Sequence, residues 1–292
     1  MEQDEPQPEY CDCDGFHDGS CRTREALRNT KLKCTMIHSY PKQYHALYDS
    51  FKDGGTIRKW VNAVEKMGRE ILESNPEINR VQLVDQLPDD WTIAPALGGF
   101  IVAGPKNPQA LHVMRTMGAT WVMDQQHWAV TYEQLAEYIN KEDLYKFKGD
   151  MLEVLSEIFF TIFQGDEGLG IREYTPVEIA EDFGVDATGV NVNGHKVVVQ
   201  VKYRSNPDDL IPFADIARTF TSAVCQLRIT VVIQHPRTVY LFTISNGVTA
   251  AFQKVMGDKT VLVNRATIAT KIDNNCNFWK MAFEMMMTTL QS

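Results

Sequence analysis

The stretch from Gly184 to Arg204, GVDATGVNVNGHKVVVQVKYR, decides the expected fold of the second half of the chain. Asn193-Gly194 is a strong two-residue signal for a hairpin turn, and valines are frequent on both sides of it. The run from Val197 to Val201 holds four valines in five positions, which predicts a strand buried inside a sheet. We therefore expect a hairpin whose second strand ends at Lys202-Tyr203-Arg204.

Three polar side chains are expected to meet at the end of this hairpin. Gln200 and Lys202 are two residues apart, so both side chains lie on the same face of the strand. The neighbouring strand can bring Asp186 onto that face. Carboxylate and carbonyl oxygens suit Mg²⁺, and a metal-bound water beside a lysine can attack a phosphate. The alternative is a buried polar trio that only satisfies itself, because buried charges are usually paired.

Asp186, thirteen intervening residues and Gln200-Val201-Lys202 resemble the D-x(n)-(D/E/Q)-x-K signature of the PD-(D/E)xK nuclease superfamily. The segment GVDATG…VVVQVKYRS is similar to Mrr-type restriction endonucleases and to nuclease domains fused to some helicases, over about residues 146–272. Two positions depart from the signature. Gln200 replaces the second acidic residue, a variant that the Mrr-type branch shares, and no proline precedes Asp186. Because glutamine is uncharged, metal affinity would depend more on Asp186 and on a helix glutamate.

The resemblance implies an α/β fold, with a restriction-endonuclease-like core in which helices flank a central mixed sheet. KGDMLEVLSEIFF resembles the first helix of that core, whose acidic residue faces the metal. Glu153 is the best match, and Glu157, one turn later, is the reserve. The implied cofactor is Mg²⁺ or Mn²⁺, held by Asp186, Glu153 and Gln200, while Lys202 positions the attacking water. These four residues are the expected catalytic set.

Downstream of the hairpin, the family core continues as a helical stretch, two apolar strands, a helix and a further strand. The expected segments are a helix from Phe213, strands Ile229–Gln234 and Val239–Ser245, a helix Gly247–Met256, a strand Lys259–Asn264 and a methionine-rich terminal helix. The methionine-rich face is most simply core, and a dimer contact is the alternative. Four residues are expected to contact DNA: Tyr203, Arg204, Arg218 and Lys148.

Composition restricts the class of protein. The chain has 292 residues, of which 44% are hydrophobic and 23% charged, as in ordinary globular proteins. No apolar run approaches the ~20 residues that cross a bilayer, and the acidic N-terminus is not a secretory signal. We therefore expect an intracellular protein without a membrane partner, cytoplasmic or, in a eukaryotic or viral setting, nuclear. The net charge of −9 argues against a general nucleic-acid coat protein but not against a nuclease.

The N-terminal segment carries a second candidate metal site. Cys11, Cys13, His17 and Cys21 follow a C-x-C-x3-H-x3-C spacing, and Cys34 comes later. Thiolates and imidazole at short spacing are ligands that Zn²⁺ selects, and the metal would then be structural. The alternative is a set of free reduced cysteines in an acidic tail.

Residues 41–145 are expected to form an accessory region. The pattern predicts a helix from Pro41, a second helix capped by Thr56, a strand at GGFIVAG, a helix starting at Asn107 or Pro108, and a tryptophan-containing hairpin. The order of these last elements, over about residues 99–130, weakly resembles HARP-like modules. Trp121 and Trp128 are expected to be core residues, with base stacking as the alternative.

The sequence thus predicts three parts: a Cys/His-rich segment (residues 1–40), a helical and small α+β region (41–145) and a nuclease domain (146–292). The resemblance implies a restriction-like or structure-specific deoxyribonuclease that acts on DNA. A homodimer, or a helicase or ATPase partner on another chain, is compatible with it, since no phosphate-binding loop motif is present here. Two alternatives stay open: an inactive DNA-binding subunit of a restriction, repair or helicase complex, and a zinc-stabilised protein adaptor.

Overall fold

The computed structural model describes residues 30–73, 87–164, 166, 169–177, 184–219 and 238–292. These residues divide into two compact units: one comprises the described chain up to Asn62 together with Met151–Ser292, and the other is Ala63–Asp150. The boundaries fall inside two helices, α3 (Ile57–Glu73) and α6 (Tyr132–Ile162). This division groups residues 41–62 with the C-terminal half, whereas the sequence suggested boundaries near residues 40 and 145.

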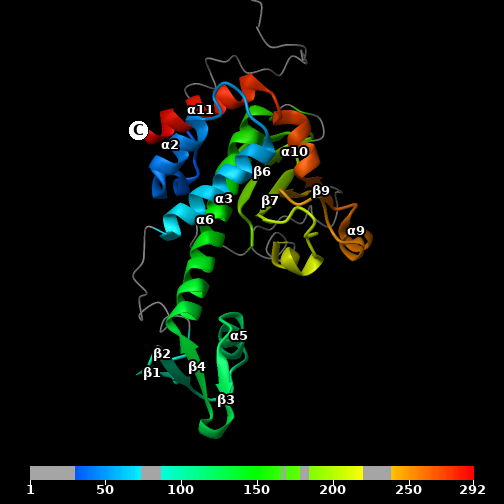
Figure 1. Cartoon of the computed structure of the whole chain (residues 1–292). Helices are drawn as coiled ribbons and strands as arrows, with labels where there is room; N and C mark the ends of the chain where they lie inside the picture. The colour runs from blue at the N-terminus through cyan, green and yellow to red at the C-terminus, as the bar shows by residue number, and fades with distance from the viewer. Residues whose placement is uncertain (1–29, 74–86, 165, 167–168, 178–183, 220–237) are drawn as a thin grey trace, which may run out of the picture. The chain divides into compact units, whose positions relative to one another are not determined.

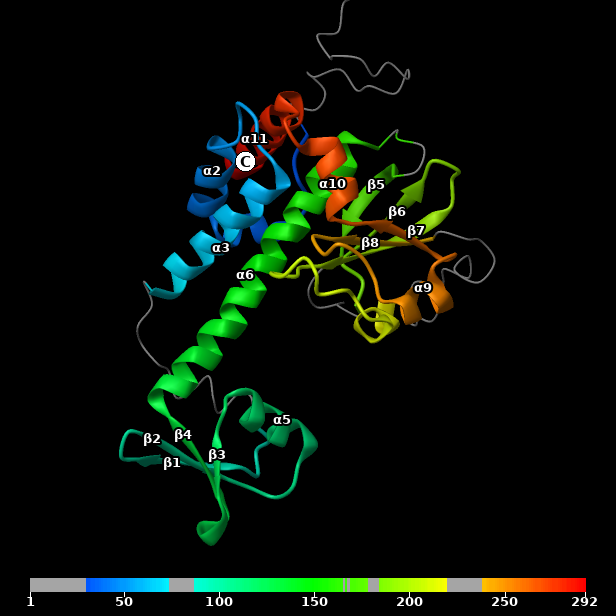
Figure 2. The ribbon, with the colours of Figure 1, turned by 45° about the vertical axis from the view of Figure 1, so that its right-hand side comes forward.

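The larger unit contains a mixed five-stranded sheet (Figures 1 and 2). The first and third strands are each antiparallel to the second, which lies between them, and the last three strands run parallel. In spatial order the strands are β5 (Ile171–Pro176), β6 (Ala187–Asn191), β7 (Lys196–Lys202), β8 (Val239–Thr243) and β9 (Thr260–Val263). The expected α/β class with a mixed sheet and flanking helices is therefore confirmed.

The predicted hairpin is present as β6 and β7, paired from Ala187↔Val199 to Val190↔Lys196. Gly194 has φ +80°, a conformation that glycine adopts without the cost other residues meet. The side chain of Asn191 accepts hydrogen bonds from the backbone N–H groups of Asn193 and His195, each at 3.0 Å. Local turn chemistry thus fixes the register that positions every side chain on β7.

The two faces of the sheet are covered by different elements, as Figure 2 shows. On one face, Phe160 of α6 contacts Tyr240 and Phe242 of β8, with ring centroids 5.9 and 5.6 Å apart. On the other face, Leu241 packs in a cluster with Val198 and with Phe252 of α9 (Ala250–Met256). Burial on both faces explains the near-continuous apolar runs of β7 and β8.

Several helices complete this unit. The predicted helices at Pro41 and after Thr56 are present, and the hydroxyl of Thr56 accepts a hydrogen bond from the N–H of Lys59 at 3.2 Å. In the terminal helix, Met285 and Met286 are fully buried in the core of the chain. The bounds are η1 (Thr35–Ser39), α2 (Pro41–Asp49), η4 (Phe213–Asp215), α10 (Arg265–Ile272) and α11 (Cys276–Leu290). The predicted strand Ile229–Gln234 lies outside the described residues.

The smaller unit contains an antiparallel sheet in the order β1-β2-β4-β3. Its predicted helix starts as expected, because the side chain of Asn107 accepts hydrogen bonds from the N–H groups of Gln109 and Ala110. Gly118 follows this helix with φ +70°. The bounds are β1 (Thr92–Ala96), β2 (Gly99–Ala103), α5 (Pro108–Thr116), β3 (Thr120–Val122), η2 (Met123–Gln125) and β4 (His127–Thr131). The predicted strand, helix and hairpin are confirmed.

One prediction about local structure is wrong. The segment Lys141–Asp150 was expected to be a polar connector, but it lies within the single helix α6. It contains no proline, and its lysine, glutamate and leucine residues favour helix. Phe147, at 2% exposure, also anchors it in a core. Among the described residues, no helix combines the length and the apolar character needed to cross a membrane.

Candidate metal site

Asp186 lies directly before β6, and the backbone of β7 fixes its position. Its N–H donates to the carbonyl of Val199 at 2.9 Å, which continues the β6–β7 ladder by one residue. Its carboxylate oxygen Oδ2 accepts hydrogen bonds from the N–H of Val201 and from Nε2 of Gln200, both at 2.5 Å. The carboxylate is therefore held at the end of the sheet, beside the glutamine with which the sequence grouped it.

Gln200 is buried, with 2% of its surface exposed. It pairs with Leu241 across the β7–β8 ladder and, by alternation along β7, its side chain shares a face with Val198. The amide nitrogen contacts Asp186, and the amide oxygen lies 2.6 Å from the hydroxyl of Thr219. The amide is thus in contact with Asp186 at its nitrogen and with Thr219 at its oxygen.

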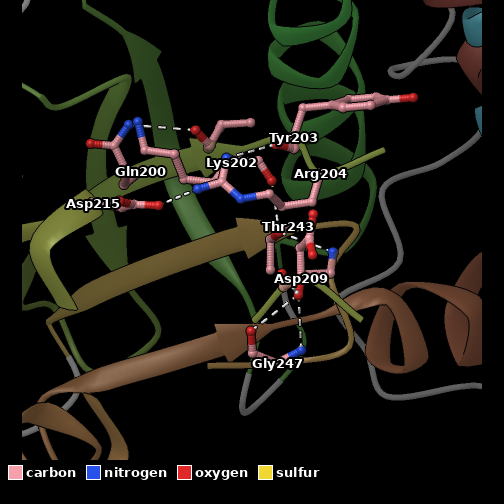
Figure 3. A network of polar contacts seen from close by, with 10 residues as sticks. Gln200, Lys202, Tyr203, Arg204, Asp209, Asp215, Thr243 and Gly247 are labelled. Atoms are coloured by element: carbon pink, nitrogen blue, oxygen red, sulfur yellow. Dashed lines mark hydrogen bonds and ion pairs between the residues drawn. The ribbon is translucent and has the colours of Figure 1, made fainter. Parts of the chain in front are cut away.

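Lys202 ends β7 on the same face as Gln200 and is half-buried. Its carbonyl accepts a hydrogen bond from the hydroxyl of Thr243 on β8 at 2.6 Å, which fixes the last residue of the strand (Figure 3). Within the described part of the chain, its ammonium group makes no hydrogen bond or ion pair. The Lys202 ammonium, two residues along the strand from the buried amide of Gln200, can therefore bind an incoming anion such as a phosphate.

Glu157 serves as an anchor for the N-terminal segment. Only 3% of it is exposed, and its two carboxylate oxygens accept hydrogen bonds from the backbone N–H groups of Lys33 at 2.6 Å and Cys34 at 2.9 Å. Burial raises the pKa of the Glu157 carboxyl, and the two backbone hydrogen bonds oppose that rise. Both oxygens of the Glu157 carboxylate, the second choice for the helix metal ligand, therefore already accept backbone hydrogen bonds.

Glu153 lies one turn earlier on α6 and is half-buried. Its charge acts on Tyr174 of β5, whose hydroxyl lies 2.7 Å from Oγ of Ser156. Burial is the main cause that raises the pKa of Tyr174 well above its ordinary value, and the charges of Glu157 and Glu153 add to it. Glu153 therefore lies near Tyr174, on the side of the sheet that α6 covers.

The predicted residues consequently approach from two sides. Gln200 shares its face with Val198, which packs in the cluster containing Leu241, whereas α6 covers the face of Tyr240 and Phe242. Glu153 lies on α6, the helix that covers the face opposite to that of Gln200. Among the described residues, no three His, Cys, Asp or Glu side chains gather as a metal-binding group. The pair that the structure brings together is one carboxylate and one amide.

Of the two arginines near this site, one forms an ion pair and the other is exposed to solvent. Arg204 forms an ion pair with Asp215 through Nη2, and its Nη1 donates to the carbonyl of Tyr203 at 3.1 Å (Figure 3). Arg218 is exposed, and its Cβ lies close to Gly184, two residues before Asp186. Arg218 is therefore the more accessible of the two arginines for a phosphate.

Lys148 needs a correction as a DNA contact. Only 3% of it is exposed, and its ammonium lies 2.6 Å from a carboxylate oxygen of Glu65 in the same unit. A buried lysine that is paired with a partly exposed carboxylate is poorly placed to meet a phosphate in solution. No local pattern around Lys148 predicts this partner, because Glu65 lies more than eighty residues away.

The aromatic and cysteine predictions have mixed outcomes. The rings of Trp121 and Trp128 are 5.2 Å apart on paired strands. Trp128 packs partly buried against the core of the smaller unit, but Trp121 is 44% exposed, so the core assignment is wrong for Trp121. Cys34 is buried, with 3% of its surface exposed. The four proposed zinc ligands lie outside the described residues: Cys11, Cys13, His17 and Cys21.

Sequence reasoning missed two hydroxyl groups, those of Thr219 and Thr243, which touch Gln200 and Lys202. Threonine has no spacing signal that separates such contacts from ordinary strand or helix positions. The chain matches no protein-family model, no curated protein and no solved structure.

Proposed function

We propose that this protein is a Mg²⁺- or Mn²⁺-dependent DNA endonuclease that hydrolyses phosphodiester bonds. The observation that carries the proposal is the contact between Asp186 and Gln200 at the end of the mixed sheet. Lys202 follows on the same face, with an ammonium that has no partner among the described groups. An acidic oxygen, an amide and a lysine at one sheet end are the parts that phosphodiester hydrolysis on a metal requires.

The order of elements supports the same proposal. A long helix, strand β5, a hairpin carrying Asp186 and Gln200-Val201-Lys202, and the parallel strand β8 come in this order along the chain, and helices flank the sheet. This order agrees with the restriction-endonuclease-like core that the resemblance to PD-(D/E)xK nucleases implies.

The residues present fit a hard divalent cation. Asp186 offers a carboxylate oxygen and Gln200 an amide oxygen, both preferred by Mg²⁺, which keeps several of its waters and takes few protein ligands. Glu153 would act through a water from the helix side. When bound, the ion would acidify a water and neutralise charge on the phosphate. Lys202 would orient the nucleophilic water, and Arg218 would hold the neighbouring phosphate.

The test is an incubation of the full chain with plasmid, single-stranded and branched DNA in Mg²⁺, Mn²⁺ or EDTA. We expect cleavage that EDTA abolishes. Lys202→Met should lower the rate by about 10²–10⁴-fold, the usual contribution of a proton-transfer or water-orienting group. Lys196→Met is the matched control, because Lys196 lies exposed at the other end of β7. Cleavage at the wild-type rate by folded Lys202→Met protein would contradict the proposal.

The same panel separates the remaining functions. Binding of branched DNA without any metal-dependent cutting would indicate an inactive DNA-binding subunit. Absence of DNA binding, even at low salt, would favour a protein adaptor. The preferred substrate in the panel would distinguish a restriction-like from a structure-specific activity, and simultaneous cutting of both strands would favour a two-fold dimer.

A further inference from the structure

Thr219 connects the candidate site to the backbone that precedes it. It is fully buried, and its hydroxyl oxygen lies 2.6 Å from Oε1 of Gln200 and 2.5 Å from the carbonyl oxygen of Gly184. On the other side of the same amide, Nε2 donates to Oδ2 of Asp186. The Gln200 amide is therefore clamped between a hydroxyl and a carboxylate.

The Thr219 hydroxyl has too few protons for its two contacts, because both neighbouring atoms are acceptor oxygens. A threonine hydroxyl has one proton, so Thr219 can donate either to Gln200 or to Gly184, but not to both. The second contact then joins two acceptor oxygens with no proton between them. Buried polar groups favour arrangements in which each contact has one donor and one acceptor.

Half a turn of the amide removes this mismatch. The two ends of a glutamine amide have nearly the same shape, so the rotation exchanges nitrogen and oxygen without repacking. The nitrogen of Gln200 would then donate to Thr219, whose single proton would be directed to Gly184. On the other side, the amide oxygen would face Oδ2 of Asp186. Two adjacent oxygens without a proton are stable only when a cation lies against both.

We infer that Thr219 is a positioning residue that turns the amide oxygen of Gln200 toward the divalent cation. In the orientation that the structure has, the amide nitrogen donates its hydrogen bond to Asp186. With the amide turned, the hydroxyl oxygen of Thr219 would accept a hydrogen bond from the amide nitrogen. The amide oxygen would then join the Asp186 carboxylate as a ligand of the cation. The N–H of Val201 remains bonded to Asp186 in either state. The inference deepens the proposed function, since it concerns the second ligand of the same site.

Isothermal titration of the full chain with Mn²⁺, without DNA, tests the inference independently of catalysis. Asp186→Asn defines the signal that belongs to this site. Thr219→Val keeps the shape of the side chain but removes the hydroxyl, and it should weaken Mn²⁺ binding about tenfold, equivalent to about 1.4 kcal/mol. Thr219→Ser should restore the affinity to within about twofold, since the hydroxyl returns. Thr260→Val is the control, because its buried hydroxyl has no described hydrogen-bond partner.

Wild-type affinity in folded Thr219→Val protein would overturn the inference, while the cleavage assay with Lys202→Met would still judge the proposed function. A wild-type protein that binds Mn²⁺ through Asp186 but cuts no DNA would overturn the proposed function alone. A wild-type protein that shows no Mn²⁺ binding dependent on Asp186 would overturn the inference.

A second measurement does not depend on the stability of a threonine variant. The side-chain NH₂ resonances of Gln200 can be assigned by their loss in Gln200→Leu, and Mg²⁺ can then be added to labelled wild-type protein. We expect both proton resonances to move, because their acceptors change from the Asp186 carboxylate to the Thr219 hydroxyl. Unchanged resonances at saturating Mg²⁺ would overturn the inference.

Discussion

Replacing Glu157 by glutamine distinguishes an anchor from a metal ligand. In the structure, the Glu157 carboxylate receives the backbone N–H groups of Lys33 and Cys34 and is almost fully buried. Glutamine retains one acceptor oxygen but places an NH₂ group against the second N–H. The substitution should therefore destabilise the folded protein while leaving the Asp186 site able to bind a cation.

The magnitude follows from two opposing effects. An unsatisfied buried donor costs about 1–3 kcal/mol. Removing the buried charge at neutral pH offsets part of that cost, because the raised pKa of Glu157 shows that burial outweighs the two hydrogen bonds on the charged form. We therefore expect a net loss of about 1–2 kcal/mol in the free energy of unfolding at pH 7.

The dependence on pH gives the sign of this charge effect. A carboxyl whose pKa is higher in the folded state than its ordinary value of 4.5 binds more protons in the native than in the unfolded chain between the two values. The contribution of Glu157 to stability therefore falls as pH rises through that interval, and it recovers as pH is lowered toward 4.5. Glutamine does not titrate, so Glu157→Gln should lose more stability relative to wild type at pH 5 than at pH 7.

The assay is urea unfolding followed by circular dichroism at several pH values, combined with Mn²⁺ titration. Glu153→Gln, one turn away on α6, is the matched control: it should weaken cation binding and change stability little. If Glu157→Gln has wild-type stability at every pH and loses the Mn²⁺ signal of the Asp186 site, Glu157 is a ligand and the reasoning about its anchoring role is wrong.

Three further substitutions test other parts of the structure. Lys148→Met should lower the free energy of unfolding by about 1–3 kcal/mol, because it removes the buried ammonium that pairs with the Glu65 carboxylate, whereas a chain that loses only DNA affinity would show that Lys148 contacts phosphate. Gly189→Ala should cost about 1–3 kcal/mol in urea unfolding, since a Cβ there would lie 2.4 Å from a methyl carbon of Ile171, and unchanged stability would contradict this packing. Gln200→Glu should tighten Mn²⁺ binding measured by titration, because it adds a charge, and weaker binding would argue against a ligand at this position.

Local sequence signals predicted the hairpin and the contact between its polar residues. Asn193-Gly194 fixes the turn, and the period of two along β7 then places Gln200 and Lys202 on one face. These features depend on neighbours in sequence. The start of α5 and the cap at Thr56 were predictable for the same reason.

Features that depend on distant partners were not predictable. The anchoring of Lys33 by Glu157 joins residues 124 positions apart, and the pairing of Lys148 with Glu65 is similarly remote. Strand β5 and helix α10 were missed because their sequences lack strong periodicity. The continuity of α6 through the polar segment was missed because a charged run reads as a connector until Phe147 is known to be buried.

The site lies where the sheet changes from antiparallel to parallel pairing, and β7 is the strand that both halves share. On its antiparallel side, the residue directly before β6 is Asp186; on its parallel side, β8 supplies the hydroxyl of Thr243 that holds the carbonyl of Lys202. The buried valines of β7 keep the backbone between these two attachments from shifting. A cation held by Asp186 and Gln200, as we propose, would gain from such a frame. The backbone of β7 fixes both polar positions, and only the rotation of the Gln200 amide beside Thr219 is left to be chosen.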